Sequence, residues 1–132
     1  ALPISKSRET LAKVKALEPK IRTGLITHSG FIPFQDGRDI DFFSIENSAI
    51  TVLTVWQAHL RGKTVSAWTV NTEEDIERMI RLGVDDIITD DPKRVQEALR
   101  SREEIEAETD FWDVLDEVYP EENDDSATID DA

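Results

Sequence analysis

The spacing of apolar residues changes several times along the chain, between a pattern typical of helices and one typical of buried strands. From residue 8 to residue 17, apolar side chains recur every three residues, which predicts a helix with Ser7 as its cap and Pro19 shortly after its end. The β-branched and aromatic residues of 64–70 predict a strand instead. The chain therefore combines both kinds of element.

Further elements follow from the same patterns. Strands are expected at four places: Thr23–Thr27, Asp41–Ile45, Thr64–Val70 and Asp85–Thr89. Helices are expected at four places: Arg8–Leu17, from Ser48 to just before Gly62, from Thr72 to just before Gly83, and from Asp91 to about Arg102. In the second of these helices, Leu53, Trp56 and Leu60 share one apolar face.

The alternation of strands and helices limits the fold class. It specifies a parallel sheet covered by helices, since each parallel crossover needs a connection long enough to return along the sheet. About four strand-containing units occupy residues 1–102, whereas a complete (β/α)₈ barrel needs about 250 residues. The sequence predicts an α/β fold of parallel βα units that forms half of a TIM barrel or a small open sheet. A flavodoxin-like sheet is the weaker interpretation, because no glycine-rich phosphate loop follows any strand.

Charge divides the chain unevenly. The 132 residues include 29 acidic and 15 basic side chains, for a formal charge of −14. Residues 1–102 hold all 15 basic and 15 of the acidic side chains, so residues 103–132 hold the remaining 14 acidic ones and no basic one. We therefore expect a folded body at 1–102 and an acidic tail at 103–132. A nucleic-acid partner is not expected, because phosphate binding requires a basic patch.

The tail contains a second apolar pattern. Phe111, Leu115 and Val118 form one stripe of a short amphipathic helix expected at 109–119, with Thr109 or Asp110 as its cap. Such a stripe can dock onto the outer helices of the body or into a basic groove of a partner, and docking onto the body is the favoured interpretation. Beyond Pro120 the acidic segment is expected to be disordered.

Composition excludes several kinds of site. The chain has no cysteine and two histidines, which excludes disulfides and thiolate zinc sites and limits imidazole-based metal binding. The longest apolar stretch, Ala49–Leu60, is interrupted by polar residues and is far shorter than the roughly 20 residues of a membrane span. Neither a span nor a secretory signal is recognised. The compartment stays open between the cytoplasm and a membrane-associated parent protein.

Two runs of sequence together resemble a known family. The run from Lys63 to Asn71 (KTVSAWTVN), followed by an acidic helix start and the run from Leu82 to Pro92 (LGVDDIITDDP), is similar to the C-terminal half of the glycerophosphodiester phosphodiesterase family. The segments 11–19, 23–27 and 41–47 agree with the helix after that family's fourth strand, its fifth strand and its sixth strand. The resemblance covers residues 1 to about 102.

The resemblance implies a fold and an activity. Family members are (β/α)₈ barrels that hydrolyse glycerophosphodiesters to glycerol 3-phosphate and an alcohol, using a divalent cation held by acidic residues and two catalytic histidines. Their His-Arg-Gly, Glu-x-Asp and His-Asp motifs and a later acidic ligand belong to the N-terminal half of the barrel, which the resemblance does not cover, and neither His-Arg-Gly nor His-Asp occurs in this sequence. We therefore expect a fragment or truncated gene product that is inactive alone, with no catalytic residue. The Mg²⁺ or Ca²⁺ ion is expected only in the full-length parent.

Three residues are expected to line the substrate site. Active sites of barrels lie where strands end, and Glu46, Trp68 and Asn71 follow or end predicted strands. By resemblance, Trp68 matches the aromatic residue that lines the glycerol end of the substrate, although a tryptophan on a strand also serves in core packing. Asn71 also suits a turn and helix start, and Glu46 also suits a solvated loop.

The other candidates have structural interpretations that we prefer. Asp90 and Asp91 are interpreted as a helix start before proline rather than a metal site. His28 is expected at the surface and His59 in a structural role on its helix, and Arg38 in solvent. None of the five is assigned a function.

One residue departs from the family pattern. Asp86 stands where the family usually has glycine, so a carboxylate enters a strand that should be buried on both faces. Either Asp86 reaches solvent or the sheet is looser than in relatives.

Half of a barrel also leaves unpaired strand edges and unsupported apolar side chains. We therefore expect self-association or a complementing N-terminal half as partners. The alternative to an enzyme part is a non-enzymatic interaction module built from the half-barrel and the acidic tail.

Overall fold

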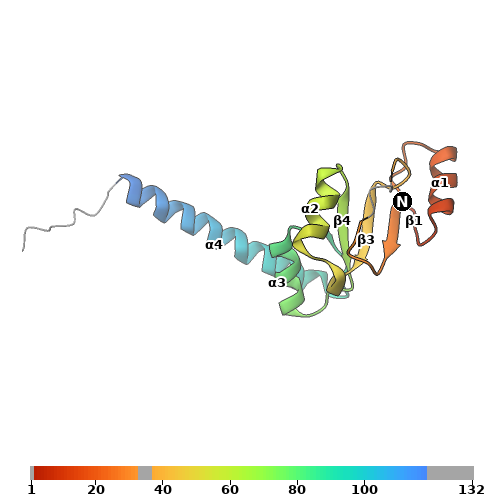
Figure 1. Ribbon diagram of the computed structural model, residues 1–132. Coiled ribbons are helices and arrows are strands. Elements are labelled where there is room, and N and C mark those ends of the chain that lie inside the picture. The colour runs from red at the N-terminus through yellow and green to blue at the C-terminus, as the bar shows by residue number, and fades with distance from the viewer. Residues whose placement is uncertain (1, 33–36, 119–132) are drawn as a thin grey trace, which may run out of the picture. The chain divides into compact units, whose positions relative to one another are not determined.

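The computed structural model of the chain describes residues 2–32 and 37–118, without the side chains of Leu115 and Asp116 (Figure 1). The chain divides into two units, residues 1–98 and residues 99–132. The expected disorder beyond Pro120 and part of the loop before Asp41 lie outside the described residues.

The first unit contains a five-stranded parallel sheet in the order β1-β2-β3-β4-β5. The strands are β1 (Ile4–Ser5), β2 (Gly24–Thr27), β3 (Phe42–Glu46), β4 (Thr64–Trp68) and β5 (Asp86–Ile87). The helices are α1 (Arg8–Leu17), α2 (Val52–Leu60), α3 (Glu73–Leu82) and α4 (Pro92–Val118), with a short 3₁₀ turn, η1, at Asn47–Ala49. The parallel α/β fold predicted from the sequence is confirmed. Strand β1 was not among the four predicted strands.

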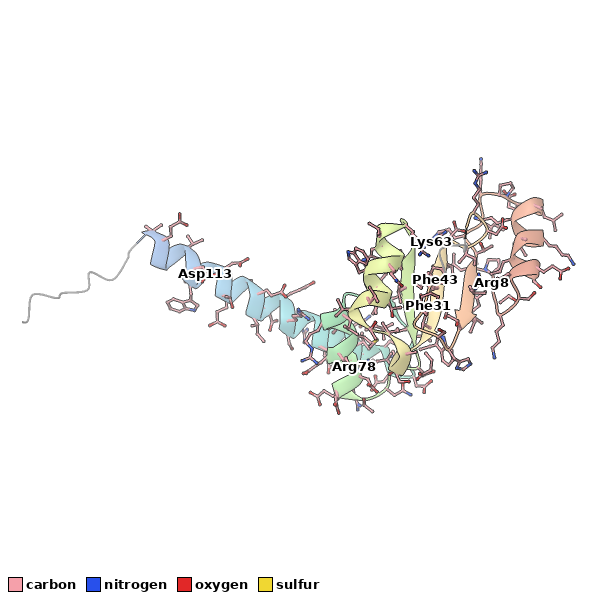
Figure 2. All side chains as sticks on the ribbon, in the orientation of Figure 1. Arg8, Phe31, Phe43, Lys63, Arg78 and Asp113 are labelled. Atoms are coloured by element: carbon pink, nitrogen blue, oxygen red, sulfur yellow. The ribbon has the colours of Figure 1, made fainter. Side chains whose placement is uncertain are left out.

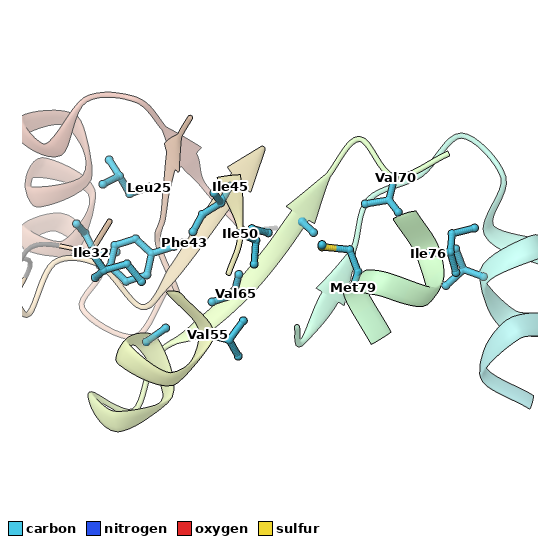
Figure 3. Packing of buried hydrophobic residues seen from close by; sticks show 14 of the residues in the cluster. Leu25, Ile32, Phe43, Ile45, Ile50, Val55, Val65, Val70, Ile76 and Met79 are labelled. Carbon is cyan, nitrogen blue, oxygen red and sulfur yellow. The ribbon is translucent and has the colours of Figure 1, made fainter. Parts of the chain in front are cut away.

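One face of the sheet forms the core with the helices. Alternate strand residues Leu25, Phe43, Ile45 and Val65 are almost completely buried against apolar residues of the helices (Figure 3). The helix residues in this cluster are Leu11, Val55, Ala58, Ile76 and Met79. The core thus lies between the sheet and its helices, as the predicted patterns require.

The other face of the sheet carries a different set of side chains. Gly24 and Phe42 are register partners, and a Cβ atom on Gly24 would lie 2.2 Å from the Phe42 ring, so only glycine fits beside this ring. Ser44, Ser66 and Asp86 form the next row. The Ser66 hydroxyl donates to the Asp86 carboxylate at 3.2 Å, and Asp86 is exposed. Of the two outcomes considered for Asp86, the structure therefore shows that it reaches solvent.

Most predicted helix ends are confirmed. Ser7 caps α1 through its side chain, which accepts a hydrogen bond from the backbone N–H of Thr10. Thr72 caps α3 in the same way. Gly83 ends α3 with a φ of +74°, in the left-handed region that glycine tolerates best.

The predicted start of the second helix was wrong. Helix α2 begins after Thr51, which forms a capping box with Thr54, rather than at Ser48. The buried residues of α2 are Thr54, Val55 and Ala58. These small side chains allow the helix to lie close to the sheet, and Thr54 Oγ1 donates to the Gly30 carbonyl at 2.8 Å.

The apolar face of α2 that was predicted from the sequence is therefore exposed. Leu53, Trp56 and Leu60 are 56%, 57% and 65% exposed. The helix therefore has two apolar faces, of which the one with the smaller side chains packs on the sheet.

The predicted break in the last helix is also wrong. Helix α4 runs without interruption from Pro92 to Val118, so no new helix starts at Thr109 or Asp110. Thr109 Oγ1 donates to the Ile105 carbonyl instead of capping a helix. Ion pairs from Arg100 to Glu104 and from Arg102 to Glu106, each four residues apart, support the segment where a break was expected.

Among the described residues, no helix has the length and apolar character needed to cross a bilayer.

Candidate functional site

The carboxyl edge of the sheet is where a site is expected. In parallel α/β sheets the loops that follow the strands meet at this edge, so side chains from several strands converge there. Strands β2, β3 and β4 end here at Thr27, Glu46 and Trp68, and Glu46 is the register partner of Trp68. Register partners on parallel strands point to the same face of the sheet. Glu46 and Trp68 therefore flank the same surface.

Trp68 lies beside His28. The two ring centroids are 5.0 Å apart and the ring planes meet at 83°, an edge-to-face contact. The indole Nε1 of Trp68 is buried and has no hydrogen-bond partner among the described residues. A buried N–H without a partner is costly, so a polar atom of a ligand would stabilise it. The peptide bond from Trp68 to Thr69 is cis.

The sequence analysis did not assign His28 to the site. It placed this residue at the surface, and the residue is indeed exposed. Its contact with Trp68 joins the ends of β2 and β4, which lie on either side of β3 in the sheet and are 41 positions apart at Thr27 and Trp68. The available indication was its position directly after a predicted strand.

Glu46 occupies a half-buried position at the end of β3. Its carboxylate accepts a hydrogen bond from the hydroxyl of Ser48, two residues later. This bond uses one carboxylate oxygen, so the other can contact a ligand. Glu46 therefore lies at a strand end and is bonded to Ser48, rather than lying free in a loop. No ion pair among the described residues includes it.

Asn71 is fully engaged in holding two loops together. Its side-chain Nδ2 donates to the Asp90 carboxylate at 2.7 Å. Its Oδ1 accepts hydrogen bonds from the Asp90 backbone N–H at 3.0 Å and from Thr89 Oγ1 at 3.1 Å. These contacts join the loop after β4 to the loop after β5. The turn and helix start weighed against ligand binding involve the next residue, Thr72, which caps α3.

An ion-paired network below this edge was missed by the sequence analysis. Arg78 lies on α3 (Figure 2). Its guanidinium donates to the Asn47 side-chain oxygen at 2.9 Å, to the Asn47 carbonyl at 3.1 Å and to Asp75 at 3.2 Å. Asn47 in turn donates to the Thr69 carbonyl at 2.9 Å. Arg78 therefore fixes the residue that follows Trp68. Asn47 lies 31 positions from Arg78, so no local pattern could reveal this contact.

The described residues contain no group of three or more potential metal ligands. Asp90 is bonded to Asn71, and Asp91 accepts from the Arg94 backbone N–H at 3.3 Å, consistent with a helix start. The carboxylates described at this edge therefore do not form a cation site by themselves. Arg38 is exposed.

His59 lies away from this edge. Its Nε2 is 2.8 Å from the Asp85 carboxylate, which also accepts the backbone N–H of Val65 at 2.8 Å. Val65 is near the start of β4, so this pair lies at the amino end of the sheet. His59 has the structural role that was expected.

Comparisons with known proteins agree with this geometry. A sequence profile described as the glycerophosphoryl diester phosphodiesterase family matches residues 5–94. A glycerophosphodiester phosphodiesterase of Caldanaerobacter subterraneus subsp. tengcongensis is 32% identical over 94 residues, which are 69% of this chain and 39% of that protein.

Solved structures give the same result. A phosphodiesterase of Oleispira antarctica, determined in complex with the product sn-glycerol-3-phosphate, matches with 26% identity and a TM-score of 0.67, covering 75% of this chain and 41% of that one. A glycerophosphodiester phosphodiesterase of Parabacteroides distasonis matches with 25% identity and a TM-score of 0.66, covering 75% and 42%.

The matched relatives are longer than this chain, which spans about two fifths of their length. The five-stranded sheet corresponds to the C-terminal half of their (β/α)₈ barrel. The profile covers more than half of the chain, and it includes both Trp68 and the loops that Asn71 connects. The chain belongs to the glycerophosphoryl diester phosphodiesterase family.

Proposed function

We propose that this chain supplies one wall of the substrate site of a glycerophosphodiester phosphodiesterase, and that it does not hydrolyse substrate alone. The reaction adds water across a P–O bond, releasing glycerol 3-phosphate and an alcohol. The observation that carries the proposal is the buried indole N–H of Trp68, which lacks a partner at the edge where barrel active sites form.

Four residues at this edge have different tasks in the proposal. Trp68 presents its ring to the glycerol carbons and its Nε1–H to a glycerol or phosphate oxygen. His28 contacts the edge of that ring and fixes its orientation. Glu46, held by Ser48, accepts a hydrogen bond from a glycerol hydroxyl. Asn71, the third residue expected to line the site, acts by positioning the loops after β4 and β5.

The reaction also needs groups that this chain does not provide by itself. Neutralising the phosphoryl oxygens calls for a divalent cation, Mg²⁺ or Ca²⁺, and protonating the departing alkoxide calls for a positioned acid. The described residues do not fit a cation site, so both groups would come from an N-terminal half-barrel.

A chimera tests the proposal. Residues 1–98 would replace the matching C-terminal segment of the Caldanaerobacter relative, and release of glycerol 3-phosphate from glycerophosphodiesters would be measured with Mg²⁺ or Ca²⁺. We expect turnover from the chimera and none from the 132-residue chain. Trp68→Ala in the chimera should lower kcat/KM by about 10- to 100-fold, mainly through KM, as expected for a lost binding contact.

Trp56→Ala is the matched control, because Trp56 is an exposed tryptophan on the outside of α2. A folded chimera without turnover would contradict the proposal, and so would an equal effect of the two substitutions. Turnover by the 132-residue chain alone would contradict the proposed need for a second half.

A second function is an interaction module without catalysis. The observation that favours it is the set of exposed apolar side chains on the acidic part of α4, including Phe111 and Val118. Deleting residues 103–132 separates this possibility from a purely structural role. If the segment is an interaction module, the deletion abolishes association with a partner while residues 1–102 stay folded. If its role is structural, the deletion lowers the free energy of unfolding.

A further inference from the structure

Helix α2 carries an exposed apolar stripe that nothing in the described structure covers. Val52, Leu53, Trp56 and Leu60 are all more than half exposed. At 100° per residue they fall within a sector of about 100° around the helix. Along the axis they extend over about 12 Å, at 1.5 Å per residue. We call these four residues the α2 stripe.

The second unit carries an exposed stripe of similar size. Phe111, Val114 and Val118 on α4 are 57%, 56% and 59% exposed and share one face. They extend over about 10 Å of helix, which is close to the length of the α2 stripe. We call these three residues the α4 stripe. Trp112 is equally exposed, at 55%, but points about 120° away from the centre of this stripe.

We propose that the α4 stripe of one copy of this chain packs on the α2 stripe of a second copy. Two helices pack through side-chain stripes of this kind at an axis separation of about 8–10 Å. The lengths of the two stripes match, and each presents large apolar side chains that lose contact with water on association.

Charge favours this pairing over contact between two α4 stripes. Residues 103–118 include eight acidic side chains and no basic one, so two such helices would repel each other. Residues 48–63, which contain α2, include no acidic side chain and end in the basic Arg61 and Lys63. The Asp85 carboxylate near α2 is already bonded to His59. The acidic helix therefore meets no free carboxylate from the α2 segment itself.

The continuity of α4 favours a second copy of the chain as the source of the α2 stripe that the α4 stripe contacts. After Pro92 the helix contains neither glycine nor proline, and the ion pairs of Arg100 with Glu104 and Arg102 with Glu106 support it. A second copy can be reached without a break in this helix. When two copies exchange their α4 stripes, two contacts form and the assembly closes as a dimer.

Sedimentation equilibrium of the full chain tests the proposal. We expect a monomer–dimer equilibrium that weakens about tenfold or more in the double variants W56Q/L60Q and F111Q/V118Q. Trp112→Gln is the matched control and should leave the equilibrium unchanged. All substituted side chains are more than half exposed, so the variants should fold, which circular dichroism would verify.

Mixing the two double variants distinguishes contact between copies from other arrangements. The W56Q/L60Q chain keeps an intact α4 stripe and the F111Q/V118Q chain keeps an intact α2 stripe. The mixed pair keeps one of the two contacts intact, so the mixture should associate more tightly than either variant alone and more weakly than the wild type. A mixture that associates no more tightly than its two components would overturn the proposal, as would a wild-type chain that is monomeric throughout. Self-association that persists in both variants would place the contact elsewhere, at the strand edges, and would also overturn it.

Discussion

The two ends of the sheet treat their polar groups differently. At the amino end, the Asp41 carboxylate accepts bonds from Lys15 at 2.6 Å and from the Thr23 backbone N–H at 2.7 Å, and Asp85 is bonded to His59 and Val65. At the carboxyl end, the indole N–H of Trp68 is buried without a partner among the described residues. The bonded carboxylates at the amino end contribute to stability, whereas the unpartnered indole N–H at the carboxyl end is the group that we propose meets a ligand.

The largest effect on stability is expected from a substitution at the amino end of the sheet. Asp41→Ala removes the acceptor for Lys15 and for the Thr23 N–H, and it leaves the largely buried Lys15 ammonium without a counter-charge. We expect the free energy of unfolding to fall by about 2–4 kcal/mol. Urea denaturation measures this loss. Glu9→Gln breaks an exposed pair with Lys13 and is the control, which should leave the midpoint unchanged. Equal midpoints for both variants would contradict the comparison.

A smaller effect is expected where α3 supports the carboxyl end. Arg78→Ala removes three hydrogen bonds and leaves the buried Asn47 side-chain oxygen without its donor, while the Asn47 carbonyl keeps the bond from the Ile50 N–H. The expected loss of unfolding free energy is about 1–3 kcal/mol. The exposed Arg81 on the same helix provides the control, Arg81→Ala. If the two variants unfold at the same urea concentration, the Arg78 network does not support this edge.

Acidification provides a third test. Burial alone would raise the pKa of Asp41, but the hydrogen bonds and charge of Lys15 and the bonds from Thr23 outweigh it and hold the pKa below its ordinary 3.8. A carboxyl whose pKa is lowered in the folded state stabilises the protein above its unfolded-state pKa. That stabilisation is lost as the pH falls through the folded pKa.

Thermal unfolding between pH 5 and pH 2 should therefore show a smaller loss of Tm for Asp41→Asn than for the wild type. Parallel losses in the two proteins would show that Asp41 contributes nothing to the acid sensitivity.

The smallest effect is expected at the carboxyl end. Trp68→Phe removes the unpartnered N–H and keeps an aromatic ring beside His28. The lost packing and the relieved polar group oppose each other, so unfolding free energy should change by about 1 kcal/mol or less. Urea denaturation checks this. A loss above about 3 kcal/mol would mean that the indole N–H has a structural partner, and the contrast between the ends would fail.

The sequence predicted what depends on local pattern. Caps such as Ser7 and Thr72 and the end at Gly83 depend on neighbours within a few residues, so they could be read directly. The start of α2 was misplaced because Thr51 and Thr54 cap it reciprocally, and Ser48 looked equally suitable. The continuation of α4 was missed because threonine is a common cap residue, whereas the Thr109 hydroxyl donates to the Ile105 carbonyl inside the helix.

Contacts between segments that are distant in the sequence could not be predicted from such local patterns. Trp68 was singled out through the family resemblance, but its neighbour His28 comes from a different strand end and was set aside. The Arg78 network joins segments about 30 residues apart for the same reason. The Asn71 hydrogen bonds show that the side chain of a residue expected to line the site can be bonded to the neighbouring loop instead.

The most direct test of the account follows the indole N–H groups in solution. The chain has three tryptophans, Trp56, Trp68 and Trp112, so a ¹⁵N-labelled sample gives three indole signals, which single Trp→Phe variants would assign. On titration with sn-glycerol 3-phosphate to about 50 mM, a range that detects millimolar affinity, the Trp68 signal should shift and saturate while the other two stay in place. A stationary Trp68 signal, or equal shifts of all three, would contradict the claim that this edge binds the substrate.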